Sequence, residues 1–236
     1  MNKILTIARK ELTAYFKSPV AYIVLVITIS VFNVFFYLII DDNREASLRD
    51  MFKVMEFMFI FIVPILTMGI FAEEKLTGTM EFLMTTPTTN TEIVLGKYLG
   101  SLTFFTVIFG TTLIYYPIIE FFGQPDLAAT LSGYAGIWLE GALFIAVGIL
   151  MSSLTRSQIV AAISSYGVLF SLSFSALFTK YLPSPAETLV IYAGTASHAQ
   201  NFAVGLVTPG DLIYFLSGIF ACILLARLSV ENRIWQ

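Results

Sequence analysis

The chain has 236 residues, of which 57% are hydrophobic and only 12% are charged, and its mean hydropathy is +0.84. Soluble domains carry about 25% charged residues, so this composition indicates an integral membrane protein surrounded by a lipid bilayer. The formal net charge of -3, without any basic run, argues against a nucleic-acid partner. One cysteine and one histidine cannot build an intrachain disulfide or a His/Cys metal cluster, so we expect no structural metal.

The segment at residues 1–19 precedes the first long apolar run and is predicted to be an amphipathic helix along the inner membrane surface. Its apolar side chains recur at helical spacing, with Lys and Arg between them: Ile4, Ile7, Ala8, Leu12 and Tyr15. The apolar run that follows is as long as a full span and has no small-residue cleavage pattern after it. We therefore expect a retained first helix and not a signal peptide.

Six apolar runs are long enough to cross a bilayer, whose hydrocarbon core of about 30 Å needs about 20 helical residues. They cover approximately residues 21–40, 55–72, 98–122, 135–154, 159–178 and 212–228. Pro64 is expected to kink the second run, and Pro117 lies near the far end of the third. The sequence predicts an all-α membrane protein with six spans that form one domain over residues 1–236.

The basic residues near the ends of these runs predict the orientation. With six spans both termini share one side, and that side carries nine Lys and Arg residues against four on the other. Because basic residues are enriched in cytoplasmic segments, both termini are predicted to be cytoplasmic.

The segment at residues 73–90 interrupts the apolar pattern between the second and third runs. Its first part reads EEKLTGTMEFLMTTP, with apolar residues on one face of a short helix: Leu76, Met80, Leu83 and Met84. Pro87 should end this helix, and Thr89 with Glu92 fits a capping box that starts the next one. The sequence therefore predicts a helix, a Thr/Pro turn and a second helix on the cytoplasmic side.

This amphipathic segment could pack on lipid headgroups or on a protein. Three acids, Glu73, Glu74 and Glu81, outnumber the single Lys75, and an anionic inner leaflet would repel them. A protein partner is therefore the better neighbour.

Polar side chains inside the predicted spans have two interpretations each. Glu140 lies about four residues inside the fourth run, where it could line a substrate or proton path or reach the outer headgroups. Asn33 in the first run could bond a neighbouring helix or line the same path.

The last external segment, residues 179–211, is too apolar for a solvated linker and is expected to fold back as short helices into the outer leaflet. It contains the single histidine, His198. A lone histidine without a nucleophile motif is more often a loop residue that forms hydrogen bonds than a catalytic one, so no catalytic residue is predicted.

The segment at residues 73–87 resembles the motif of membrane subunits of type-2 ABC exporters, in which a glutamate, a Gly-Thr pair, a second glutamate, apolar residues and a proline lie between spans two and three. The matching positions are Glu74, Gly78, Thr79, Glu81, Leu83 and Pro87. Residues 8–24 resemble the entry to the first span of these permeases. Residues 198–220 are similar to the gliding-motility-associated subgroup, and permeases that are accessory to a copper enzyme are near relatives. Ala199 and Ala203 depart from the subgroup pattern, in which bulkier or charged residues are common.

This resemblance implies a permease of the bacterial inner membrane that pairs with a second, identical or related permease chain and with a separate ABC ATPase subunit. The chain has no phosphate loop, so ATP and Mg would be bound by the ATPase, and this chain would carry no cofactor and no enzymatic activity. The resemblance makes residues 73–87 the coupling helix that contacts the ATPase, with Glu73, Glu74, Gly78, Thr79, Glu81, Leu83 and Pro87 in the contact region. In this family the last external segment helps to close the outer mouth, so His198, Phe202, Gly205 and Asp211 are candidate gate residues. The segment could equally be a structural plug.

Two functions remain open at this point. The chain could be the permease of an exporter, or it could belong to a complex that transmits ATP-driven motion to an extracytoplasmic machine, such as one for gliding motility, with a periplasmic or auxiliary membrane subunit. An integral membrane enzyme is disfavoured, because no G-x-S-x-G motif, paired histidines or cluster of intramembrane acids is present.

Overall fold

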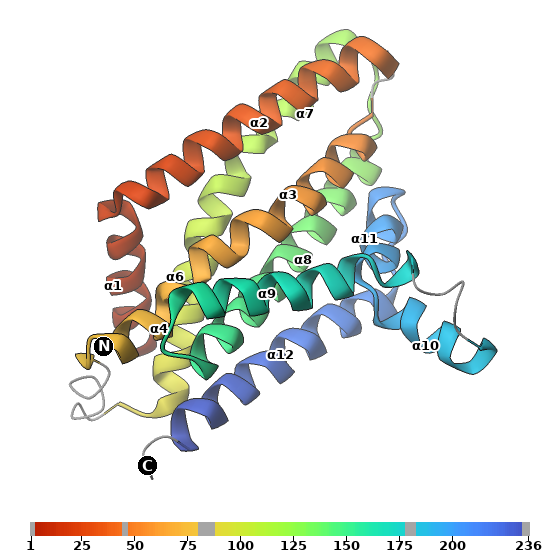
Figure 1. Cartoon of the computed structure of the whole chain (residues 1–236). Coiled ribbons are helices and arrows are strands. Elements are labelled where there is room, and N and C mark those ends of the chain that lie inside the picture. The colour runs from red at the N-terminus through yellow and green to blue at the C-terminus, as the bar shows by residue number, and fades with distance from the viewer. Residues whose placement is uncertain (1–2, 44–46, 80–87, 178–182, 233–236) are drawn as a thin grey trace.

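The apolar runs of the sequence fold into long helices that lie side by side in the computed structural model (Figure 1). The structure describes residues 3–43, 47–79, 88–177 and 183–232, and its regular elements in these ranges are all helices. They are, in chain order, α1 (Lys3–Lys17), α2 (Pro19–Asn43), α3 (Arg49–Thr67), α4 (Gly69–Leu76), α6 (Asn90–Gly110), the 3₁₀ turn η1 (Thr111–Ile114), α7 (Tyr115–Phe122), α8 (Leu127–Leu154), α9 (Gln158–Ser173), α10 (Ser184–Ala193), α11 (Thr195–Ala203) and α12 (Pro209–Asn232).

Five stretches of the described residues are long and apolar enough to cross a membrane. They are residues 19–41, 49–76, 90–122, 127–154 and 209–231. The second joins α3 to α4 across a break at Met68, which lies four residues after Pro64 and whose N–H donates to the Pro64 carbonyl at 2.9 Å. Helix α3 continues through Pro64 to Thr67, so the interruption lies four residues beyond the position at which the sequence predicts a kink.

The prediction of six full-length spans is not confirmed within the described residues. The fifth predicted run forms α9, which has only 16 residues and is about 24 Å long at 1.5 Å per residue. It ends because Phe174 leaves helical geometry, with φ -101° and ψ 16°. Even so, α9 runs from the end of α8 back toward α10, and the two termini lie at the same end of the molecule (Figure 1).

Helix α8 is the centre of the bundle. Of its apolar window 78% is buried, against 17% for α2 and for α12, and it packs against α3, α6, α9, α11 and α12. Close packing depends on glycines: a Cβ at Gly133 would lie 2.1 Å from the ring of Phe52 on α3, and a Cβ at Gly141 would lie 2.2 Å from the ring of Phe105 on α6. Glycine at these positions lets two aromatic rings lie directly on the α8 backbone.

Helix α1 lies across α6 at the end of the molecule that holds the termini. Glycines four residues apart on α6 make the contact: a Cβ at Gly96 would lie 2.6 Å from Cβ of Ile7, and a Cβ at Gly100 would lie 2.6 Å from Cβ of Glu11. The apolar stripe expected from the sequence is half-buried at residues Ile4, Ile7, Ala8, Leu12 and Tyr15. This stripe therefore faces the protein.

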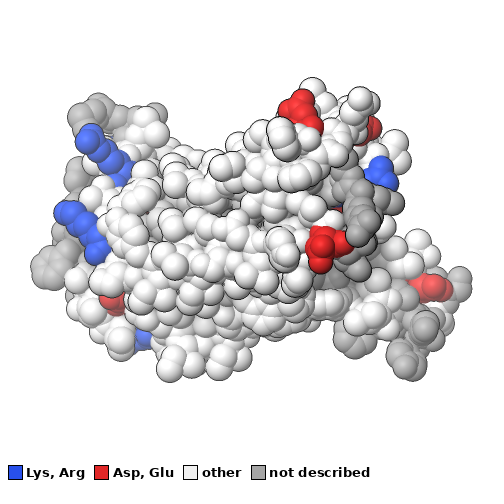
Figure 2. Space-filling model, turned by 90° about the horizontal axis from the view of Figure 1, so that it is seen from above, with Lys and Arg blue, Asp and Glu red and all other residues white. Residues whose placement is uncertain are grey.

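Charged side chains separate along the molecule. Figure 2 shows Lys and Arg gathered at the end near the N-terminus and Asp and Glu mainly at the opposite end. This is the asymmetry from which the sequence predicts the orientation of the spans.

Candidate functional site

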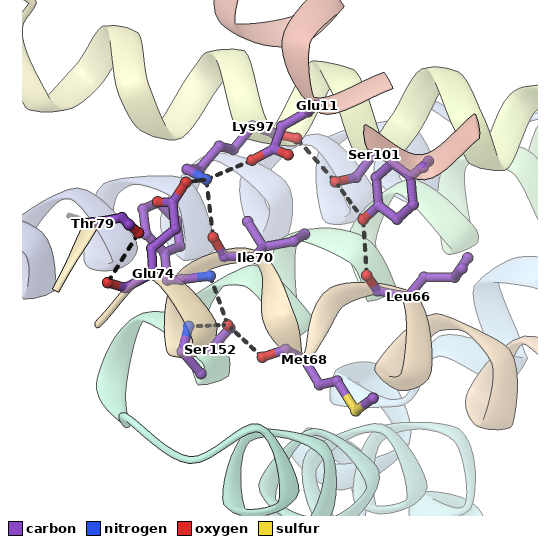
Figure 3. A network of polar contacts seen from close by, with 12 residues as sticks. Glu11, Leu66, Met68, Ile70, Glu74, Thr79, Lys97, Ser101 and Ser152 are labelled. Carbon is purple, nitrogen blue, oxygen red and sulfur yellow. Dashed lines mark hydrogen bonds and ion pairs between the residues drawn. The ribbon is translucent and has the colours of Figure 1, made fainter. Parts of the chain in front are cut away.

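The break between α3 and α4 is stabilised by one hydroxyl from α8 (Figure 3). Ser152 Oγ accepts the backbone N–H groups of Phe71 and Ala72, both at 3.1 Å, and donates to the Met68 carbonyl at 2.9 Å. A helix start leaves its first N–H groups without intrahelical partners, so this completely buried serine satisfies groups that would otherwise be orphaned.

Lys97 on α6 is a buried cation at the same end of the bundle. It is 1% exposed, and its ammonium contacts Glu11 of α1 at 2.5 Å, Glu74 of α4 at 2.9 Å and the Ile70 carbonyl at 2.9 Å. The ring of Phe71 lies 5.1 Å from the ammonium, close enough for a cation–π contact. The ammonium donates hydrogen bonds to Glu11 and to the Ile70 carbonyl and forms an ion pair with Glu74, so the buried charge is paired. The second oxygen of Glu74, Oε2, is buried without a hydrogen-bond partner among the described residues.

Tyr15 extends this network from α1 to the end of α3. Its hydroxyl donates to the Leu66 carbonyl at 2.8 Å and lies 3.2 Å from Ser101 Oγ, which donates to the Lys97 carbonyl at 2.9 Å (Figure 3). Burial raises the pKa of the Tyr15 hydroxyl, so it stays protonated and donates at neutral pH. We call Glu11, Tyr15, Glu74, Lys97, Ser101 and Ser152 the anchor network; it joins α1, α4, α6 and α8.

Residues 77–79, which follow α4, are exposed and bond back to the end of that helix. Thr77 ends the helix and its hydroxyl donates to the Glu73 carbonyl at 2.9 Å, while Gly78 has a φ of 73° in the left-handed region that favours glycine. The Thr77 and Thr79 hydroxyls lie 3.0 Å apart. Gly78 therefore allows the chain to change direction after α4, and the hydroxyl contacts of Thr77 and Thr79 stabilise this turn.

The structure separates the residues that the resemblance placed in the ATPase contact region. Glu73, Gly78 and Thr79 are exposed, whereas Glu74 is half-buried and turned toward Lys97. The remaining three, Glu81, Leu83 and Pro87, lie outside the described residues. The capping box that starts α6 is confirmed: the Glu92 N–H donates to Thr89 Oγ1 at 3.2 Å, and the Thr89 N–H donates to the Glu92 carboxylate at 2.8 Å.

A pocket of about 600 Å³ opens beside α4, between α1, α3 and the start of α9. Its polar lining includes Glu11, Glu73, Glu74, Thr77 and Thr79. Part of the anchor network therefore lines a concave surface at the end of the molecule that holds the termini.

Glu140 lies deeper than the sequence suggests. Helix α8 begins at Leu127, eight residues before the expected start of the fourth run, so Glu140 is near the middle of a 28-residue helix. Its side chain is 0% exposed, and both carboxylate oxygens are buried without a hydrogen-bond partner in the described part of the chain. In this conformation the carboxylate does not reach the outer surface. Asn33, by contrast, is exposed on α2 and accepts the Tyr115 hydroxyl at 2.9 Å.

Two of the four predicted gate residues form a buried pair at the end of the bundle opposite the termini. His198 Nδ1 of α11 lies 2.5 Å from the Asp211 carboxylate of α12, and the other ring nitrogen lies 3.0 Å from the Tyr192 carbonyl. Asn201 and Thr208 donate to the other Asp211 oxygen at 3.1 and 2.7 Å. This cluster holds α11 to the start of α12.

The other two predicted gate residues hold α11 against α8. Phe202 is 1% exposed and lies over Gly136, where a Cβ would be 2.4 Å from Cβ of Phe202. Gly205 adopts a φ of 90° just after α11, which only glycine takes without strain. The two short helices α10 and α11 lie within the expected 179–211 segment.

Sequence reasoning missed the anchor network. Lys97 was used only as a positive charge for orientation, and Tyr15 only as part of an apolar stripe. The usable signal was the pair Gly96 and Gly100, because two glycines one turn apart beside a lysine indicate a helix crossing over that charge.

The long apolar helices, with the anchor network at one end of the bundle, define a multi-pass α-helical membrane protein. The family described as ABC-2 family transporter protein matches residues 5–178, which is more than half of the chain, and the chain belongs to this family. It is therefore a permease component of an ABC transporter and not itself the ATPase. The match does not confirm the gliding-motility subgroup. No curated protein matches the sequence significantly.

Proposed function

We propose that the chain is the permease of an export-type ABC transporter in a bacterial inner membrane, and that residues 73–87 couple it to a separate ATPase subunit. The observation that carries this proposal is the anchor network. It ties the base of the 73–87 segment, which is part of α4, to α1, α6 and α8, while Glu73 and Gly78 are exposed.

Contacts between side chains connect the 73–87 segment to the helices of the bundle, so a movement of this segment would be transmitted to them. Glu74 belongs to α4 and meets Lys97 of α6, which in turn meets Glu11 of α1, while Ser152 joins α4 to α8. Because a buried lysine and a buried serine tie α4 to its neighbours, we expect α4 to move together with them and not independently of them.

The proposed partners follow from the same surfaces. The ATPase supplies ATP and Mg, and its acceptor surface must suit Glu73 and the acids and hydroxyls of the adjacent pocket. A second permease chain, identical or related, would pack on one of the sparsely buried faces of α2 or α12, and lipid would cover the rest. Both termini would be cytoplasmic.

An exposed apolar surface on α10, at the end of the bundle opposite the termini, favours a second function. Helix α10 exposes Leu189, Ile191 and Tyr192, while the His198–Asp211 cluster holds the adjoining α11 to the bundle. Such a surface suits an extracytoplasmic or auxiliary subunit, so the complex could transmit ATP-driven motion without moving a solute, as in gliding motility.

The first experiment tests the coupling to an ATPase. Charge reversal at Glu73 and Glu81 (Glu73→Lys with Glu81→Lys) should reduce co-purification of the ATPase subunit, or ATPase stimulation by the permease, by about tenfold, which corresponds to about 1.4 kcal/mol. The matched control is Glu187→Lys, an exposed acid on α10 at the other end. Unchanged co-purification and stimulation in the double variant would refute the coupling proposal.

A second measurement separates the two functions. If the chain is an exporter, vesicles with the reconstituted complex should accumulate or release a cargo only with ATP. If ATP hydrolysis depends on an extracytoplasmic partner and no solute moves, the mechanical function is correct.

A further inference from the structure

We propose that Glu140 is a proton-binding site at the centre of the bundle. In this conformation the carboxyl is held as the neutral acid, and it exchanges its proton only when α3 or α11 moves away from α8. This goes beyond the proposed coupling to an ATPase and does not depend on it.

The position of Glu140 is the first argument. It is the fourteenth residue of α8, so it lies about 20 Å from the start of a helix that is about 42 Å long. Both carboxylate oxygens are buried, and neither makes a hydrogen bond of good geometry among the described residues; the Thr195 hydroxyl is the neutral group placed nearest to donate one. One neutral donor does not compensate a buried carboxylate, so a side chain in this state needs a ligand or a change of charge.

The second argument is that no cation compensates the charge. Within the described ranges, no Lys, Arg or His forms an ion pair with Glu140. Lys97 uses its donors on Glu11, Glu74 and the Ile70 carbonyl. The acidic neighbour of Glu140 is Glu56 on α3, and a negative charge on either carboxyl opposes ionisation of the other.

The third argument is the lack of room for a larger ligand. Phe202 lies over Gly136, one turn before Glu140, and the ring of Phe105 lies over Gly141, the next residue. The pockets described between residues of this chain lie near the two ends of the molecule and are not lined by Glu140. A proton is the cation that fits without displacing a ring.

Polar and titratable groups lie on several of the helices that pack against α8, and of these Glu56 and Thr195 act on Glu140. Glu56 lies on α3, and Tyr98 on α6 donates to the Ala142 carbonyl at 3.3 Å. Thr195 of α11 is a polar neighbour that is itself 0% exposed. Tyr166 of α9 is committed to the Phe61 carbonyl. The acids of α4 face Lys97 and the pocket beside it.

Polar side chains lie between Glu140 and the end of the bundle opposite the termini, although no chain of hydrogen bonds joins them in the described residues. Tyr214 of α12 lies within electrostatic reach of Glu140 and stacks on His198, with ring centroids 4.0 Å apart. His198 is bonded to Asp211. Release of the proton toward the end opposite the termini requires α11 to move away from α8 and α12, because Glu140, Thr195 and His198 are all buried.

Infrared spectroscopy of the purified chain in detergent tests the proposal at neutral pH. The wild type should show the C=O stretching band of a protonated carboxylic acid, and Glu140→Gln should lose it. Glu187→Gln, which removes an exposed acid, should keep the band. Glu56→Gln should also keep it and thereby assign the proton to Glu140.

Thermal stability is the second readout. Glutamine closely replaces a neutral acid, so Glu140→Gln should unfold at the wild-type temperature or above it. Absence of the band in the wild type, its loss only in Glu56→Gln, or a clear drop in the unfolding temperature of Glu140→Gln would overturn the proposal. Each readout uses the permease alone, so failure here differs from failure of ATPase coupling.

Discussion

Lys97 shows how one residue can hold three helices. Its ammonium is almost fully buried, while its partners Glu11 and Glu74 have side chains that are 16% and 21% exposed. The two carboxylates keep some access to water, whereas the lysine has almost none, so the buried ammonium needs the acids as partners more than they need it. Its removal leaves two carboxylates that face one another across the vacated site.

Lys97→Met should lower the free energy of unfolding by about 3 kcal/mol, because it breaks a buried pair and leaves uncompensated charges. It should also detach α1 and reduce ATPase stimulation. The triple variant Lys97→Met, Glu11→Gln, Glu74→Gln removes all three charges and should recover most of the stability. Thermal or chemical unfolding in mild detergent measures both. Equal losses in the single and triple variants would contradict this account.

At the residue scale, the sequence indicated some partners correctly and others incompletely. The Thr89 and Glu92 capping box is confirmed because both members are three residues apart, so local geometry alone brings them together. Glu74 has its partner 23 positions later in the chain, and its role depends on a helix crossing that no local pattern encodes. Glu140 was placed too near the surface because the start of α8 was expected eight residues too late.

At the scale of elements, α8 owes its central place to glycines. Three of them, Gly133, Gly136 and Gly141, receive aromatic rings from three different elements. Glycine is otherwise unfavourable in a helix, so its repeated presence here is compensated by close packing.

Gly136→Ala should lower the free energy of unfolding by about 1–3 kcal/mol, because the added Cβ would overlap Phe202 and push α11 away from α8. Gly167→Ala on α9 is the matched control: a Cβ there meets nothing within 4 Å, so this change should stabilise the protein by up to about 1 kcal/mol. Unfolding in detergent measures both changes. Similar effects of the two substitutions would show that Phe202 does not anchor α11.

The length of α9 illustrates what hydropathy can and cannot determine. The apolar run predicts a span of 20 residues, but the helix stops at Ser173 and Ser173 Oγ meets Thr195 of α11 at 3.4 Å. Hydropathy counts apolar side chains, whereas the end of a helix depends on backbone geometry and on what packs beside it.

At the scale of the whole molecule, both termini lie at one end because α9 runs back along the bundle from the end of α8 (Figure 1). The predicted cytoplasmic location of both termini therefore requires that α9 cross the bilayer despite its length. Its neighbours can shield its ends, since α9 packs against α3, α8 and α11. A short helix is accommodated by local thinning of the bilayer at modest cost.

Cysteine accessibility tests this topology. In a Cys222→Ala background, Arg156→Cys at the start of α9 should react with impermeant reagents only from the side that holds the termini. Glu187→Cys on α10 should react only from the opposite side. Labelling of both positions from one side would show that α9 does not cross the membrane. Gln124→Cys, in the turn before α8, is a reference for the side opposite the termini.

Composition and periodicity identify the chain as an α-helical membrane protein and predict most of its spans, the amphipathic N-terminal helix and the polar segment at residues 73–90. Each of these features lies within one segment, so it can be predicted from local sequence. The contacts of Lys97 with three helices and the complete burial of Glu140 emerge only when the helices pack. Both depend on which faces of distant helices meet, and that is set by the packing of rings on glycines and by the pairing of buried charges.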